Sequence, residues 1–186
     1  MECLGGLEQL SKSGLTGLYY GDEGRVSLDP CAPYGWQFKD EDVFRPAAKG
    51  AGLNCSALLT RGSDLLFEAT RQRITGRFII EQLERLSFSI QEVTVVVLDN
   101  AGVHTSRQVQ ERRPFWQRRG LFIFYLPPYS PHLNIAETLW RELKYEWLQP
   151  SDYVTAGGLF YRVRQSLAAV GTSLKIRSSE FSLGLS

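Results

Sequence analysis

The 186-residue sequence has few features of a membrane protein, a disulfide-linked protein or a nucleotide-binding enzyme. It lacks any run of 18 or more apolar residues and any basic-then-apolar N-terminal signal, which disfavours membrane-spanning and secreted proteins. Its three cysteines show neither CxxC nor Cys/His ligand spacing, so we expect reduced thiols in a cytosolic protein. Walker, Gly-rich dinucleotide and GxSxG motifs are also missing, which disfavours nucleotide hydrolysis and acyl transfer.

The composition is that of an ordinary globular domain, but the charge is unevenly distributed. Hydrophobic residues make up 43% and charged residues 22% of the chain, so we expect one domain with a full core, alone or with a short appendage. The net charge is +1, yet residues 1–104 carry ten Lys/Arg against fourteen Asp/Glu, and residues 105–149 carry seven against four. A nucleic-acid-binding surface is consistent with this pattern, although solvated helix faces are the simpler explanation.

Hydrophobic periodicity predicts strands followed by alternating helices and strands. Thr75 is expected to cap the first long helix, Pro114 to interrupt or restart the next, and Asn134 to cap the third. A strand, a helix and a strand with short links predict a parallel crossover. The order predicts an α/β fold, a ribonuclease-H-like mixed sheet flanked by helices. The expected strands are 18–20, 25–28, 53–60, 65–69, 93–98 and 121–126, and the expected helices are 75–86, a stretch from 106, 135–148 and 159–169.

Three carboxylates are expected near one edge of this sheet. Asp99 follows a strand that is apolar on both faces, Glu137 begins the helix after the next strand, and Asp22 lies in a turn after the first strand. Phosphodiester chemistry uses two cations about 3.5–4 Å apart, and Mg²⁺ prefers oxygen ligands. Each residue alone is more simply a turn, cap or ion-pair residue, so only the set of three points to catalysis.

One histidine and three aromatic side chains are candidates for contacts with a phosphate or with nucleic-acid bases. His104 could orient a water or a phosphate, or it could form an ordinary local hydrogen bond. Trp36 and Tyr129 could stack on nucleic-acid bases. Trp140 could do so too, but its position on the apolar face of a helix favours the core.

Three segments carry a resemblance to a known family. They are YYGDEGRVSLDPCAPYGWQ, VVVLDNAGVHTS and LPPYSPHLNIAETLWRELK, in this order. Together they resemble the catalytic domain of insertion-sequence 630-type transposases of the Tc1/mariner superfamily, which have a DDE ribonuclease-H-like fold. The resemblance covers about residues 18–150.

The resemblance implies that Asp22, Asp99 and Glu137 form a catalytic triad that binds two Mg²⁺ or Mn²⁺ ions. It implies hydrolysis at transposon ends, with water as the first nucleophile, and then attack of the freed 3′-hydroxyls on a TA target. We expect supporting roles beside the triad for Glu23, Asn100, His104 and Asn134, and DNA contacts from Arg107, Tyr129, Arg141 and Lys144.

The implied partners are the terminal inverted repeats and the TA target DNA, bound by a homodimer or a higher oligomer at the nucleoid in a prokaryotic cytoplasm. Two departures from the family matter: Asn134-Ile135-Ala136-Glu137 replaces Asn-Pro-Ile-Glu, and no helix-turn-helix region precedes the first strand. We therefore expect a short lead-in at 1–17 (a short helix or irregular), a catalytic domain at 18–150, and a C-terminal helix and tail at 151–186. A non-catalytic remnant that binds DNA or a full-length transposase, and a stand-alone ribonuclease-H-like nuclease, are the alternatives.

Overall fold

The computed structural model describes residues 2–28, 51–128 and 130–176, and these contain one five-stranded sheet in the order β3-β2-β1-β4-β5. The strands are β1 (Gly17–Ser27), β2 (Gly52–Leu59), β3 (Leu65–Thr70), β4 (Thr94–Leu98) and β5 (Leu121–Tyr125). The first three strands pair antiparallel, whereas β4 is parallel to β1 and β5 is parallel to β4. The predicted α/β fold with a mixed, ribonuclease-H-like sheet is confirmed.

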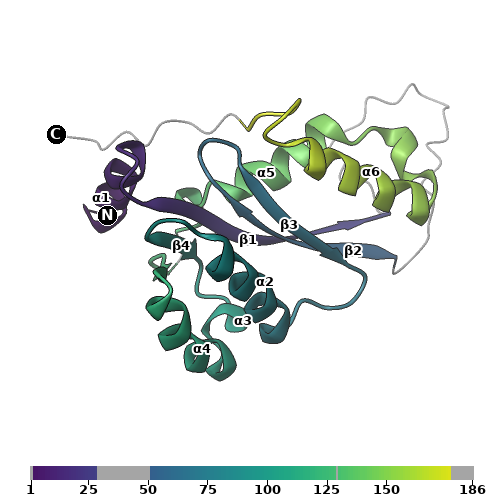
Figure 1. The fold of residues 1–186 in the computed structure, drawn as a ribbon. Helices are drawn as coiled ribbons and strands as arrows, with labels where there is room; N and C mark the ends of the chain where they lie inside the picture. The colour runs from purple at the N-terminus through teal and green to yellow at the C-terminus, as the bar shows by residue number, and fades with distance from the viewer. Residues whose placement is uncertain (1, 29–50, 129, 177–186) are drawn as a thin grey trace.

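Helices cover both faces of the sheet (Figure 1). On one face lie α2 (Gly76–Ser89) and α4 (Arg107–Arg118), and on the other lie α5 (Ala136–Glu142) and α6 (Ala156–Ala169). Thr75 caps α2 as predicted, because its side chain accepts a hydrogen bond from the Phe78 backbone N–H. The other helical elements are α1 (Glu2–Lys12), α3 (Gly102–Thr105), the 3₁₀ turns Pro131–Leu133 and Pro150–Val154, and a π-helical turn, Leu143–Trp147. No helix in the described part of the chain is long and apolar enough to cross a membrane.

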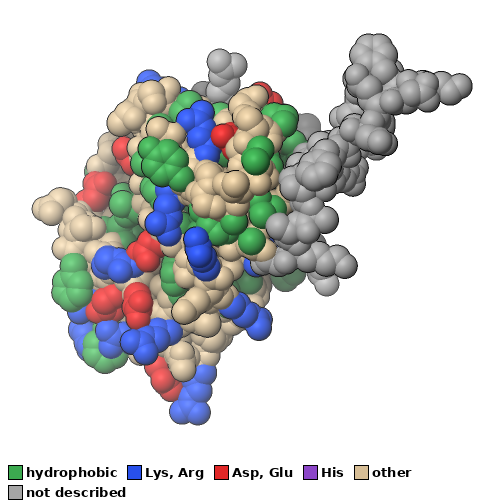
Figure 2. Space-filling model, turned by 90° about the vertical axis from the view of Figure 1, so that its right-hand side faces the viewer, with side chains coloured by type: hydrophobic (Ala, Val, Ile, Leu, Met, Phe, Trp, Pro, Cys, Tyr) green, Lys and Arg blue, Asp and Glu red, His purple; other side chains and the backbone are tan. Residues whose placement is uncertain are grey.

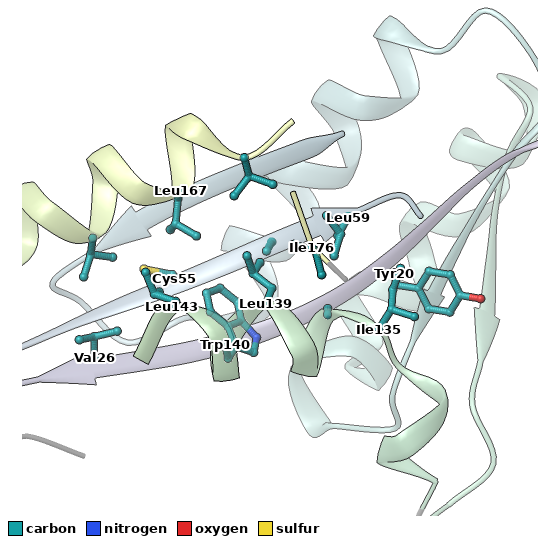
Figure 3. Close-up of a cluster of buried hydrophobic side chains, with 14 of the residues drawn as sticks. Tyr20, Val26, Cys55, Leu59, Ile135, Leu139, Trp140, Leu143, Leu167 and Ile176 are labelled. Atoms are coloured by element: carbon teal, nitrogen blue, oxygen red, sulfur yellow. The ribbon is translucent and has the colours of Figure 1, made fainter. Parts of the chain in front are cut away.

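The larger core lies between the sheet and the layer of α5 and α6 (Figure 3). Leu139 and Leu143 project from this layer towards β1 and β2, where they meet Val26 and Cys55. Leu167 of α6 belongs to the same cluster, so the C-terminal helix is part of the layer that covers the sheet.

The N-terminal segment is a helix, one of the two possibilities open from the sequence. Leu4 of α1 joins the larger core. Glu8 is buried, accepts a hydrogen bond from the Tyr20 hydroxyl and forms an ion pair with Arg61 at 2.6 Å. These contacts fix α1 against β1 and the β2–β3 turn.

The first strand differs from the prediction, because the expected strands 18–20 and 25–28 are replaced by one continuous strand that ends at Ser27. The expected turn at Asp22-Glu23-Gly24 is instead paired with Ala57, Ser56 and Cys55 of β2. Turn-like composition predicted a break, but pairing with a buried neighbouring strand outweighs that local preference. As a result, Asp22 is held rigidly within a strand.

The prediction that Pro114 interrupts or restarts the second helix was wrong. The residue lies inside α4, which runs from Arg107 to Arg118. Proline removes one backbone hydrogen bond, but tertiary packing offsets that loss here. Trp116, fully buried on the same helix, packs against α2 and so keeps the turn after Pro114 in place.

The third predicted helix changes type part of the way along. The α-helical part ends at Glu142, and a π-helical turn covers Leu143–Trp147. A wider turn breaks the 3.6-residue repeat. Leu143 stays fully buried, whereas Trp147, expected on the same apolar face, is only partly buried.

Glu84 connects α2 to α4, and we expect its contribution to the free energy of unfolding to be lost at acid pH. Burial alone would raise the pKa of Glu84, but hydrogen bonds from Arg119, Arg112 and Trp116 lower it to about 2. The folded-state pKa lies below the ordinary value of 4.5, so this contribution is present above pH 4.5 and is lost as the pH falls towards 2. We expect it to be about 2 kcal/mol, allowing for solvent screening.

Urea unfolding at pH 7 and at pH 2.5 measures this contribution. Glu84→Gln should lower the free energy of unfolding at pH 7 and differ little from the parent at pH 2.5. Glu81→Gln is the matched control, because Arg77, on the exposed side of α2, is the ion-pair partner of Glu81 among the described residues. An equal loss for Glu84→Gln at both pH values would contradict the assignment.

Some sequence predictions fall outside the described residues. Trp36, Tyr129 and the tail from residue 178 are among them, and so is the loop around Pro30.

Candidate active site

A cleft of about 390 Å³ opens where β1 passes the end of β4. All three predicted carboxylates, from β1, from the end of β4 and from α5, line this single cleft. The lining residues are Asp22, Asp99, Asn100, Ala101, Leu126, Pro127, Pro128, Ser130, Asn134 and Glu137.

Asp22 is the most buried of the three carboxylates. Burial, together with the charges of Glu23, Asp99 and Glu137, raises the pKa of Asp22 to about 7, although a hydrogen bond from the Glu23 backbone opposes this rise. Excess negative charge of this kind is what a bound cation would relieve.

Asp99 is held by the loop that follows β4. Its Oδ1 atom accepts hydrogen bonds from the Ala101 backbone N–H at 2.9 Å and from His104 Nδ1 at 2.7 Å. The hydrogen bond from His104 lowers the pKa of Asp99. Because both bonds end on Oδ1, Oδ2 is left to face the cleft.

His104 lies behind Asp99 and is fully buried. Its Nε2 atom is 2.8 Å from Oε1 of Glu23, so the imidazole links two carboxylates. Burial alone would lower the pKa of His104, but the hydrogen bonds to Asp99 and Glu23 raise it to about 10. The ring therefore carries a proton on both nitrogens at neutral pH and donates to each carboxylate.

Glu23 supports the site from the opposite face of the sheet. Successive side chains of a strand alternate between faces, so Glu23 points away from Asp22 and towards the α2 side. It does not line the cleft, and its connection to the site runs through His104.

Asn134 joins the start of α5 to β1. Its Nδ2 group donates to the Gly21 carbonyl at 2.9 Å, and its Oδ1 accepts from the Ala136 backbone N–H at 3.1 Å. The prediction that Asn134 caps this helix was wrong by one residue: the N-cap of α5 is Ile135, without a side-chain cap hydrogen bond, and Asn134 bonds the Ala136 N–H from just before the helix. The two bonds set the first turn of α5, which carries the exposed Glu137, beside Asp22.

Asn100 lies in the cleft, whereas the predicted DNA-contacting residues that the structure describes lie outside it. Asn100 lines the cleft, and its side chain donates to the Leu126 carbonyl. Arg107 at the start of α4 forms an ion pair with Glu111 outside the cleft. Arg141 and Lys144 also lie outside the lining, and Lys144 belongs to the π-helical turn.

Trp140, for which the sequence favoured the core over base stacking, also contacts one of the cleft carboxylates. It is in the core, at 6% exposed, but its Nε1–H also donates to Oδ2 of Asp22 at 3.1 Å. The apolar helix face gave no sign of this bond, because it depends on how α5 lies across β1.

The donor set suits a hard divalent cation. Carboxylates from three elements line the same cleft, and Mg²⁺ and Mn²⁺ take such oxygens together with water. As they stand, no three Asp, Glu, His or Cys side chains in the described ranges are close enough to hold one ion. The exposed Glu137 is the carboxylate with the most freedom to move inwards.

Comparisons with known proteins support the fold and the family. The chain has a TM-score of 0.59 and 17% identity to the "Mos1 transposase paired-end complex with left transposon end", covering 90% of this chain and 52% of that one. The "Mos1 Strand Transfer Complex" has a TM-score of 0.61 and 16% identity, and the match covers 90% of this chain and 52% of that one. The catalytic core domain of BIV integrase has a TM-score of 0.51 and 12% identity, and the match covers 85% of each chain.

The chain thus spans about half the length of the Mos1 chains that it matches. At such low identity the likeness shows the fold alone. No curated protein matches the chain by sequence. The sequence profile described as "DDE superfamily endonuclease" matches residues 17–156, which is most of the chain. The chain therefore belongs to the DDE superfamily of endonucleases.

Proposed function

We propose that this chain is the catalytic domain of a DNA transposase that cleaves DNA at transposon ends and joins the freed 3′-hydroxyls to a TA target. One observation carries the proposal: Asp22, Asp99 and Glu137 come from three separate elements and line one cleft. The letters DDE in the family name stand for two aspartates and one glutamate, and Asp22, Asp99 and Glu137 match that set.

Asp22, Asp99 and Glu137 would hold two Mg²⁺ or Mn²⁺ ions. Bound in this cleft, the ions would stabilise the attacking and leaving oxygens of the phosphodiester. Asp22 and Asp99 are the fixed ligands, since a strand and the His104 bond hold them in place. Glu137 would complete the site from the first turn of α5.

Exposed Arg and Lys side chains near the cleft would contact the DNA backbone. Charged side chains of both signs are interspersed over the face shown in Figure 2, so no single large basic patch marks the DNA path there. Arg141 is exposed one helical turn after Glu137, and within the described residues no carboxylate pairs with it. This makes Arg141 the favoured phosphate contact among the predicted ones, with Lys144 and Tyr129 as further contacts.

Arg141→Ala should weaken DNA binding similarly for all sequences and reduce the salt dependence by about one counterion. Arg107→Ala is the matched control, because Arg107 is neutralised by Glu111 and should contribute less. Fluorescence anisotropy of a labelled duplex across a salt series gives both slopes. Equal effects of the two substitutions would contradict the role of Arg141.

Incubating the chain with supercoiled plasmid and Mn²⁺ tests the proposed function directly. We expect nicks that end in 3′-hydroxyls, and the same reaction on an RNA–DNA hybrid should be slower. Faster cleavage of the hybrid would favour a ribonuclease-H-like nuclease, and DNA binding without cleavage would favour a non-catalytic remnant. In this proposal the chain acts on terminal inverted repeats as a homodimer or higher oligomer, at the nucleoid of a prokaryotic cytoplasm.

A further inference from the structure

The indole of Trp140 belongs to the core and also reaches the cleft. The ring packs between α5 and the sheet (Figure 3) and is 6% exposed. A buried indole N–H needs an acceptor, and here the acceptor is Oδ2 of Asp22. One side chain therefore connects the packing of α5 to the orientation of a cleft carboxylate.

Gly24 makes this arrangement possible. It lies two residues after Asp22, on the same face of β1, and the indole occupies the space that a side chain would take. A Cβ atom at Gly24 would be 2.5 Å from Cδ2 of Trp140. Because the ring is confined between this glycine and α5, its N–H has little freedom to leave Asp22.

We propose that Trp140 is a positioning residue, which holds Oδ2 of Asp22 so that Oδ1 is directed towards a divalent cation. The inference rests on the proposed metal-dependent function. It parallels Asp99, which lines the cleft and whose Oδ1 accepts from His104 and Ala101, so that Oδ2 is left for a ligand there. Each aspartate then offers one oriented oxygen, which suits cations that keep several waters.

A titration of the whole chain with Mn²⁺ tests the role of Trp140. The loss of the EPR signal of the free ion measures how much Mn²⁺ is bound. Trp140→Phe keeps an aromatic ring but removes the N–H, and it should weaken Mn²⁺ binding about 10–100-fold. The amount of Mn²⁺ needed for half-maximal plasmid nicking should rise by a similar factor, with much of the rate restored at high Mn²⁺.

Trp116→Phe is the matched control. Trp116 is also buried and donates its Nε1–H to a carboxylate, Oε2 of Glu84 at 2.8 Å, but it lies between α2 and α4. This substitution should lower stability and leave Mn²⁺ affinity unchanged. Parental affinity in Trp140→Phe, or equal weakening in both variants, overturns the positioning role.

A measurement on the parent chain covers the case in which Trp140→Phe does not fold. The Trp140 indole N–H resonance should shift on addition of Mg²⁺ and broaden beyond detection with Mn²⁺, while that of Trp116 persists. Trp→Phe variants at Trp36, Trp116 and Trp147 assign it by elimination. A Trp140 signal that is unaffected at saturating Mn²⁺ overturns the inference.

Asp99→Asn separates this inference from the proposed function. If Asp99→Asn loses Mn²⁺ affinity and Trp140→Phe does not, only the role of Trp140 is overturned. If Asp99→Asn also binds Mn²⁺ as the parent does, the metal site fails and both proposals are overturned.

Discussion

Replacing Asp99 by asparagine is expected to reduce Mn²⁺-dependent nicking of plasmid DNA at least about 10³-fold, or about 4 kcal/mol of transition-state stabilisation. The amide oxygen can still accept from the Ala101 backbone and from His104, so the loop after β4 should keep its conformation. What is lost is the charge on the oxygen that faces the cleft. Nicking rates at saturating Mn²⁺, with circular dichroism to confirm folding, measure the effect.

Asp64→Asn is the matched control for this substitution. Asp64 lies in the β2–β3 turn, outside the cleft, and its hydrogen bonds within the described part of the chain are to Thr60. It should nick DNA at the parental rate. Undiminished nicking by folded Asp99→Asn would remove Asp99 from the site.

Replacing His104 by alanine is expected to cost about 3 kcal/mol of unfolding free energy, because it leaves Asp99 and Glu23 without their shared partner. The pKa of His104 is raised from 6.5 to about 10 in the folded chain. Its contribution is therefore complete below pH 6.5 and is lost as the pH rises through 10. The parent should exceed His104→Ala in stability at pH 6 and lose much of that advantage by pH 10.

Urea unfolding at the two pH values measures this difference. His132→Ala is the control, since the other histidine of the chain is exposed in the 3₁₀ turn before α5. It should change stability by less than about 0.5 kcal/mol. A difference between the parent and His104→Ala that does not depend on pH would show that His104 is not charged between the two carboxylates.

Local sequence pattern predicts the elements that depend on local preferences. The β2–β3 hairpin, the Thr75 cap and the buried strand before Asp99 were all readable, because turn residues, capping residues and apolar runs act within a few positions. The three carboxylates could be proposed as a set because each follows or begins an element that local pattern predicts. Their roles as ligands stay a prediction until metal binding is measured.

Features that depend on tertiary packing could not be read in this way. Asp22 was expected in a turn, because nothing local shows that β2 pairs with β1 without a break from Tyr20 to Ser27. The bonds from Trp140 to Asp22 and from His104 to Glu23 join residues 118 and 81 positions apart. Each requires the relative placement of a helix or loop and a strand, which periodicity does not specify.

Anomalous diffraction from crystals of the chain soaked in Mn²⁺ shows directly whether the cleft binds a divalent cation. We expect Mn²⁺ peaks in the cleft, within coordination distance of Asp22 and Asp99, with Glu137 turned inwards as a further ligand. The peaks should disappear in Asp99→Asn. Mn²⁺ bound only elsewhere, in a chain that still nicks DNA, would contradict the assignment of this cleft as the catalytic centre.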